Sequence, residues 1–246
     1  MKSFDEIDSH GISLYVNAFR KALLGDGYFE HTLPSLLPYK VTTTPCFAVA
    51  GNQYLRYGTE PDVWRVGDRH DRFFWIGSLF RHEVNKDRTY AFEFTLVDFY
   101  VRKGVLEDLV AQFESLLRYA ERSLDLPPLS SIGVVRVPFH RFSVDSFRLA
   151  KPSWVAVTGY PVTESFYDTL DEANTNKFEL YYVDQEQAIE IASAGVVGPN
   201  VNPLMYVENI DRDSDRQIFE KQFAGLGFGV ARLALVYDLF RRSLGS

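Results

Sequence analysis

The sequence predicts an α+β fold, in which a mostly antiparallel sheet is flanked by helices. Residues 73–100 read as two apolar-aromatic strands around a polar loop. Residues 11–24 and 104–124 carry apolar side chains at the spacing of one helix face. Near the C-terminus, a glycine-rich strand runs directly into a further helix. Because paired strands and separate helices are typical of α+β proteins, these observations indicate that class.

Length and composition predict one domain spanning residues 1–246. A chain of 246 residues is long enough to bury one sizeable core. Its 46% hydrophobic and 24% charged residues are ordinary for a globular protein. The one cysteine, Cys46, rules out an intrachain disulfide and suits a reducing compartment. No apolar run approaches the roughly 18 residues of a membrane span and no signal-peptide pattern begins the chain, so we expect a cytoplasmic protein.

The net charge of −7 argues against an extensive surface for nucleic acid. Proteins that bind long nucleic acids usually present a basic surface, and the sequence contains no basic run. Some acidic enzymes do bind RNA, so the charge lowers the weight of an RNA partner without excluding one. The five scattered histidines and one cysteine form no zinc-binding set.

The hairpin places chemically distinctive side chains on one surface. Its first strand ends in Arg81-His82-Glu83, its loop covers residues 84–91 and its return strand covers residues 92–101. Since side chains alternate between the faces of a strand, Arg81 shares a face with Glu83, and a second set shares one face of the return strand: Phe92, Phe94, Leu96, Asp98 and Tyr100. An aromatic ring, a guanidinium and carboxylates suit a nucleotide. An amphipathic hairpin with solvated charges explains the same pattern equally well.

The C-terminal stretch GLGFGVARL, residues 225–233, adds a second candidate element for ligand binding. Its glycines allow a ligand to approach the backbone closely. Arg232 stands at the start of the following helix, where anions are favoured. By itself, such a glycine pattern is often only a turn.

Taken together, FRHE, EFTLVDFY and GLGFGVARL resemble motifs 2 and 3 of class II aminoacyl-tRNA synthetases. The closest resemblance is to the aspartate, asparagine and lysine subgroup, with some features of the pyrrolysine enzyme. The order and spacing of the motifs cover nearly the whole chain and imply the α+β core of that family. A helix, a strand and Pro34 resemble motif 1, which forms the dimer interface in the family. The resemblance therefore implies a homodimer.

The resemblance implies ATP and Mg²⁺ as cofactors and assigns a role to each motif residue. Arg81 would bind the α-phosphate and Arg232 would lie over the adenine, which makes them the catalytic candidates. The other residues implied in ATP binding are Glu83 for the adenine amino group, Phe94 for stacking, Arg88 for the γ-phosphate, and Gly227 and Gly229 for close approach. Glu190 and Ser193 would hold Mg²⁺ against the triphosphate, because a hard cation prefers oxygen ligands.

The amino-acid substrate is implied to contact Glu60 through its α-amino group and Asp98 and Tyr100 through its side chain. The chain departs from the family's pattern at several positions. Pro61-Asp62 replaces an apolar-aromatic helix start, and Thr89-Tyr90 replaces a histidine. Val197 replaces a second carboxylate, and Ala231 replaces an acidic residue before the motif 3 arginine.

Complete enzymes of this subgroup carry an anticodon-binding domain ahead of the core, whereas this sequence begins essentially at motif 1. The resemblance therefore favours a stand-alone AMP-forming carboxylate–amine ligase, which adenylates an amino acid and transfers the acyl group to an amine or another small acceptor. A tRNA-acylating or tRNA-modifying paralogue is one alternative. A catalytically silent regulator that binds an amino acid or nucleotide is the other, supported by Val197, Ala231 and Thr89-Tyr90. The sequence identifies neither the amino acid nor the acceptor.

Overall fold

The computed structural model describes residues 9–38, 46–59, 62, 69–81, 92–161, 170–171, 174–197 and 222–245. Some positions of the predicted site lie outside these residues, namely Glu60, Glu83, Arg88, Thr89 and Tyr90. The hairpin loop of residues 84–91 and the connection of residues 200–221 lie outside them as well.

A sheet of eight strands forms the centre of the fold, in the order β1-β5-β6-β13-β12-β11-β8-β7. The pairs β1–β5 and β7–β8 are parallel, and the remaining neighbours are antiparallel. The prediction of a mostly antiparallel sheet is therefore confirmed. The strands are β1 (Phe29–Glu30), β5 (Arg72–Phe80), β6 (Glu93–Arg102), β7 (Val134–Pro138), β8 (Ser153–Thr158), β11 (Lys177–Val183), β12 (Ala188–Val197) and β13 (Phe223–Gly229).

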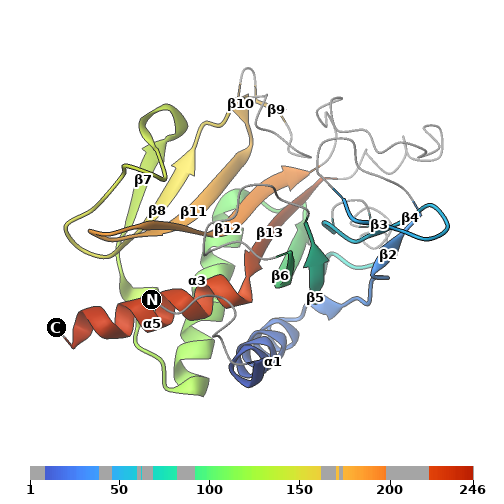
Figure 1. Cartoon of the computed structure of the whole chain (residues 1–246), viewed down its shortest axis with the longest axis horizontal. Helices are drawn as coiled ribbons and strands as arrows, with labels where there is room; N and C mark the ends of the chain where they lie inside the picture. Colours follow the sequence, from blue (N-terminus) through green and yellow to red (C-terminus); the bar gives the residue numbers. More distant parts are fainter. Residues whose placement is uncertain are drawn as a thin grey trace.

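Three helices lie together against one face of this sheet (Figure 1): α1 (Ser9–Gly25), α3 (Leu106–Leu124) and α5 (Val230–Leu244). The apolar spacing that predicts α3 is also the spacing of its buried side chains, Leu109, Phe113, Leu116, Leu117 and Ala120. They pack with alternate residues of the strands, including Val97 and Phe99 of β6. The main core therefore lies between the helices and this face of the sheet. The opposite face of the sheet points away from these helices.

Local chemistry explains where several elements end. The helix α3 begins where the carboxylate of Asp108 accepts a hydrogen bond from the Val105 amide, at 3.2 Å. It ends at Asp125, which has a left-handed backbone with φ of 52°. The strand β7 ends at Pro138 and continues as a short 3₁₀ turn, Phe139–Arg141. Proline has no amide hydrogen to continue the strand ladder, which explains this end.

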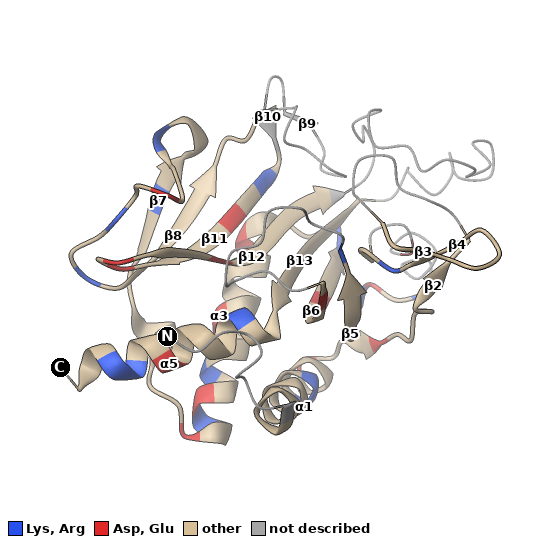
Figure 2. Ribbon diagram, in the orientation of Figure 1, with Lys and Arg blue, Asp and Glu red and all other residues tan. Residues whose placement is uncertain are grey.

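Two small sheets complete the described structure. One contains β2 (Leu36–Leu37), β3 (Ala48–Val49) and β4 (Gln53–Leu55), and the other contains β9 (Leu170–Asp171) and β10 (Asn174–Thr175). Figure 2 shows both signs of charge on β11, α3 and α5. None of the helices in the described ranges has the length and apolar character needed to cross a membrane.

Candidate functional site

The face of the large sheet opposite the three helices carries the candidate site, and we call it the site face. In β6, Val97 and Phe99 belong to the core, so alternation places Asp98 and Tyr100 on the site face. Phe94 lies on the same face, four residues before Asp98. The structure thus brings these predicted residues to one surface, as the hairpin pattern predicts.

Glycines in β13 form the floor of the site face. A Cβ at Gly225 would lie 2.3 Å from a ring carbon of Tyr100, and a Cβ at Gly227 would lie 3.3 Å from Oδ1 of Asp98. Side chains larger than hydrogen would therefore displace Tyr100 and crowd Asp98. Cross-strand register places the polar residues Asp98, Ser193 and Glu179 in one row across the sheet, together with Trp75 and Gly227.

Arg81 and Phe94, the predicted phosphate and adenine ligands, lie close together at one end of the site face. The guanidinium carbon of Arg81 is 5.5 Å from the centroid of the Phe94 ring, within the range of a cation–π contact. Nε of Arg81 donates to the carbonyl oxygen of Tyr57, at 3.2 Å. These contacts hold a cation beside an aromatic face, a pairing that suits a nucleotide.

Arg232 and Glu190 form an ion pair across the strand–helix junction. Nη1 of Arg232, in the first turn of α5, lies 3.3 Å from both Oε2 and the carbonyl oxygen of Glu190. Their side chains are 20% and 32% exposed, so a ligand can reach both. Burial of the Glu190 carboxyl group raises its pKa above the usual range, while Arg232 opposes this shift and the Glu179 carboxylate adds to it.

A β-bulge brings Glu190 and Ser193 to the same face. Tyr181 of β11 faces Glu190, but Leu180 faces Ala192, so Ile191 is an extra residue in β12. Strict alternation would place residues three apart on opposite faces. The carboxylate and the hydroxyl are both oxygen donors suited to Mg²⁺. The described residues include no group of three His, Cys, Asp or Glu side chains arranged for a metal, so this pair fits the ion only together with phosphate oxygens.

Asp98 and Tyr100 are tied to a third residue, Thr59, which the sequence did not single out. The Thr59 hydroxyl donates to Oδ2 of Asp98, and the Tyr100 hydroxyl donates to the same oxygen at 2.8 Å. Thr59 and Asp98 are 2% and 4% exposed. The carboxylate is therefore oriented by two hydroxyl groups from separate segments.

A second polar cluster, also missed by sequence reasoning, lies on β11 and directly after the end of β8. Nζ of Lys177 lies 2.9 Å from Glu179, whose other oxygen accepts hydrogen bonds from Tyr160 and Tyr181 at 2.6 and 2.7 Å. Burial alone raises the pKa of Glu179, but Lys177 and the two hydroxyls outweigh it and hold the pKa below its usual range. The signal was the alternation of charged and aromatic residues in KFELYY, residues 177–182.

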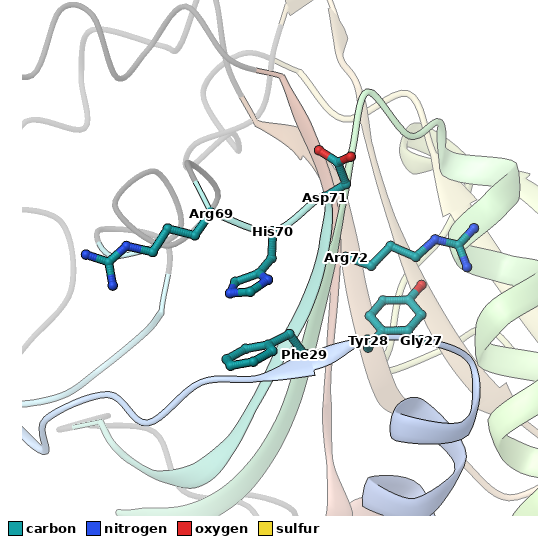
Figure 3. Close-up of a pocket in the computed structure, with 7 residues that line it drawn as sticks. All are labelled: Gly27, Tyr28, Phe29, Arg69, His70, Asp71 and Arg72. Carbon is teal, nitrogen blue, oxygen red and sulfur yellow. The ribbon is translucent and has the colours of Figure 1, made fainter.

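A separate pocket of about 490 Å³ lies beside β1, at the edge of the sheet (Figure 3). The ring of Phe29 stacks on His70 with centroids 3.9 Å apart. On the neighbouring strand, Phe73 stacks on Tyr100 at 5.2 Å. The pocket thus adjoins the substrate end of the site face without forming part of it. Its lining residues are Gly27, Tyr28, Phe29, Arg69, His70, Asp71 and Arg72.

No protein-family model matches the chain. A lysine–tRNA ligase of Mesomycoplasma hyopneumoniae is 31% identical over 123 residues, covering 47% of this chain and 25% of that protein. A lysine–tRNA ligase of Helicobacter pylori is 28% identical over 142 residues, covering 55% of this chain and 28% of that protein. The chain therefore spans about a quarter of the length of these curated relatives.

Solved structures extend the similarity over almost the whole chain. Asparaginyl-tRNA synthetase from Pyrococcus horikoshii, complexed with asparaginyl-adenylate, has a TM-score of 0.73 at 17% identity and covers 93% of this chain and 64% of that one. Asparaginyl-tRNA synthetase of Entamoeba histolytica has a TM-score of 0.70 at 14% identity and covers 90% of this chain and 62% of that one. At such identities, the structural similarity concerns the fold.

Proposed function

Because the chain is a class II aminoacyl-tRNA synthetase-like core of the aspartate, asparagine and lysine subgroup, we propose that it is an ATP-dependent, AMP-forming ligase. In this proposal it adenylates the carboxylate of an amino acid and transfers the acyl group to an amine or another small acceptor. The observation that carries the proposal is the convergence on one sheet face of Arg81, Phe94 and Arg232, which come from distant parts of the chain.

The first step needs charge neutralisation and alignment rather than a nucleophile from the protein. An oxygen of the substrate carboxylate forms a bond to the α-phosphorus, and the bond from that phosphorus to the bridging oxygen breaks, releasing pyrophosphate. Arg81 and Arg232 offset the negative charge on the phosphates. When bound, Mg²⁺ would neutralise further phosphate charge, and Glu190 and Ser193 would hold it. An acceptor amine then bonds to the acyl carbon, AMP leaves and the amine loses a proton.

The substrate end of the site favours an amino acid whose side chain carries an ammonium group. Asp98 presents a buried carboxylate on the site face, oriented by Thr59 and Tyr100. A carboxylate in a site of low water content binds a cation more strongly than in bulk water. Glu60, proposed for the α-amino group, lies outside the described residues.

ATP–pyrophosphate exchange tests this function directly. The purified protein would be assayed with Mg²⁺ against the standard amino acids and common non-protein ones. Exchange with one of them is expected and would identify the acyl donor. ATP binding without any exchange would favour a silent regulator or an unusual carboxylate, and absence of ATP binding would exclude the ligase.

The relatives named as tRNA ligases favour tRNA as the second candidate acceptor. A tRNA-acylating or tRNA-modifying enzyme would bind tRNA with an affinity that falls steeply as salt increases. The net charge of −7 opposes such binding. Transfer of the activated amino acid to tRNA, measured beside transfer to free amines, separates the two candidates.

Replacing Phe94 by alanine should weaken ATP binding by about 1–3 kcal/mol, the cost of losing a base–aromatic stack. Isothermal titration of ATP measures this effect. The matched control is Tyr119→Ala, because Tyr119 lies on α3, on the opposite side of the sheet. Equal ATP affinity in Phe94→Ala and the wild type would remove Phe94 from the adenine site.

We also propose a homodimer through the β1 edge, the part of the chain that resembles motif 1. Phe29 in this strand is 48% exposed and stacks on His70 beside the pocket of Figure 3. Phe29→Glu is expected to convert the dimer to a monomer in sedimentation velocity, because it places a charge in an apolar interface. Leu244→Glu, at a side chain that is 62% exposed, serves as the control. A monomeric wild type would contradict this proposal.

A further inference from the structure

Arg56 is a charged residue inside the fold, directly after β4. Its relative exposure is 0%, and it is among the largest fully buried side chains of the described structure. Removing a guanidinium from water is costly unless ionic and hydrogen-bond partners compensate for the lost hydration. Its partners therefore indicate what this residue holds in place.

These partners are Gly58 and Asp62, which follow Arg56 in the chain, and Pro34, which precedes β2. Nε of Arg56 donates to the carbonyl oxygen of Pro34 at 2.6 Å. Nη1 donates to the carbonyl oxygen of Gly58 at 3.1 Å and to Oδ2 of Asp62 at 2.7 Å. The amide of Asp62 donates to the carbonyl oxygen of Thr59 at 2.9 Å. One guanidinium thus connects residues 57–59 with Asp62, and we call these four residues the loop.

This loop contacts both halves of the candidate site. The carbonyl oxygen of Tyr57 accepts the hydrogen bond from Arg81 at the phosphate end. The hydroxyl of Thr59 donates to Asp98 at the substrate end, and its oxygen lies 2.9 Å from that of Tyr100. The loop therefore joins elements that are distant in sequence, and it contacts both Arg81 and Asp98.

We infer that Arg56 and Asp62 are positioning residues and that Thr59 determines substrate specificity through Asp98 and Tyr100. This inference rests on the proposed function, because it assigns Asp98 to the amino-acid substrate. It also gives a role to Asp62, a position where the sequence departs from the family's pattern. An ion pair that is buried on both sides has one strongly preferred arrangement, so it holds the Thr59 hydroxyl more rigidly than a solvent-exposed loop would.

Steady-state exchange kinetics of single and double variants test the inference. Thr59→Val removes the hydroxyl at nearly constant shape and should raise the KM for the amino acid about tenfold, the scale of one lost hydrogen bond to a charged group. Asp62→Asn should raise the same KM, and Asp62→Glu should restore part of the loss. The Kd for ATP should change little in Thr59→Val, because the lost hydroxyl bonds to Asp98 and Tyr100 at the substrate end.

Non-additivity distinguishes positioning from general destabilisation. If Asp62 acts through Thr59, the double variant Asp62→Asn with Thr59→Val should be hardly worse than the more severe single variant. Glu114→Gln, which breaks an exposed ion pair with Arg118 at 3.4 Å on α3, is the matched control and should leave KM unchanged. Additive effects of the two substitutions would overturn the inference.

A second measurement keeps the inference separate from the proposed function. Hydrogen exchange of the wild type and Asp62→Asn would be compared at the amides of Gly58, Thr59 and Asp62. Faster exchange at these amides, with unchanged exchange in α3, would support the positioning role of Arg56 and Asp62. This holds even if the wild type activates no amino acid, a result that would contradict the proposed function alone. Unchanged protection of the loop in Asp62→Asn would overturn the inference whatever the activity.

Discussion

Replacing Arg81 by alanine is expected to abolish adenylate formation while leaving the fold intact. The guanidinium lies beside Phe94 and donates to the carbonyl oxygen of Tyr57, and these two contacts orient it at the phosphate end of the site. Removing one preorganised hydrogen-bond donor that stabilises a transition state typically lowers the rate by about 10²–10³-fold. The loss of a cation that contacts a triphosphate should reach or exceed that range. Pyrophosphate exchange measures the rate, and thermal unfolding monitors the fold.

Two comparison variants make the Arg81 result specific. Arg81→Lys retains the charge but loses the planar donor fork, so it should recover only part of the activity. Arg118→Ala removes an exposed arginine of α3 and should leave the rate unchanged. Wild-type turnover by Arg81→Ala would refute the assignment of this residue to the phosphates.

Much of the fold was predictable because it follows from side-chain periodicity. The hairpin of β5 and β6 was predicted with its faces, since Val97 and Phe99 enter the core and Asp98 and Tyr100 do not. The helices α1 and α3 were also predicted with nearly their observed bounds, and α5 was predicted to follow the glycine-rich strand directly. Apolar spacing is a local property, and it is sufficient to define such elements.

The parts that escaped prediction depend on contacts between distant segments. No spacing rule indicates that Ile191 is bulged, although this bulge places Glu190 and Ser193 on one face. The pairing of Arg56 with Asp62 was likewise not predicted, because a charged residue in a short loop reads as exposed. The roles of Glu60, Glu83 and Arg88 stay predictions, since these residues lie outside the described ranges.

Arg232→Ala should also abolish adenylate formation, and its effect on metal binding should depend on pH. Burial raises the pKa of Glu190, and Arg232 is the strongest influence that lowers it. Without Arg232, this pKa should rise further, so less of Glu190 is ionised at a given pH. Because a metal ligand must be deprotonated, Mn²⁺ binding in the presence of ATP should weaken most at the acid end of the pH range tested.

Mn²⁺ binding measured by electron paramagnetic resonance across this range tests the coupling between Arg232 and Glu190. The profile of Arg232→Ala should move to higher pH than that of the wild type, whereas Arg232→Lys should move less because it retains a positive charge. Glu190→Gln removes the titrating carboxyl group, so it should require more Mg²⁺ and lose this part of the pH dependence. If Arg232→Ala keeps the wild-type profile, the two residues do not share the triphosphate and metal site. If Glu190→Gln gives an identical metal titration, Glu190 is not the metal ligand.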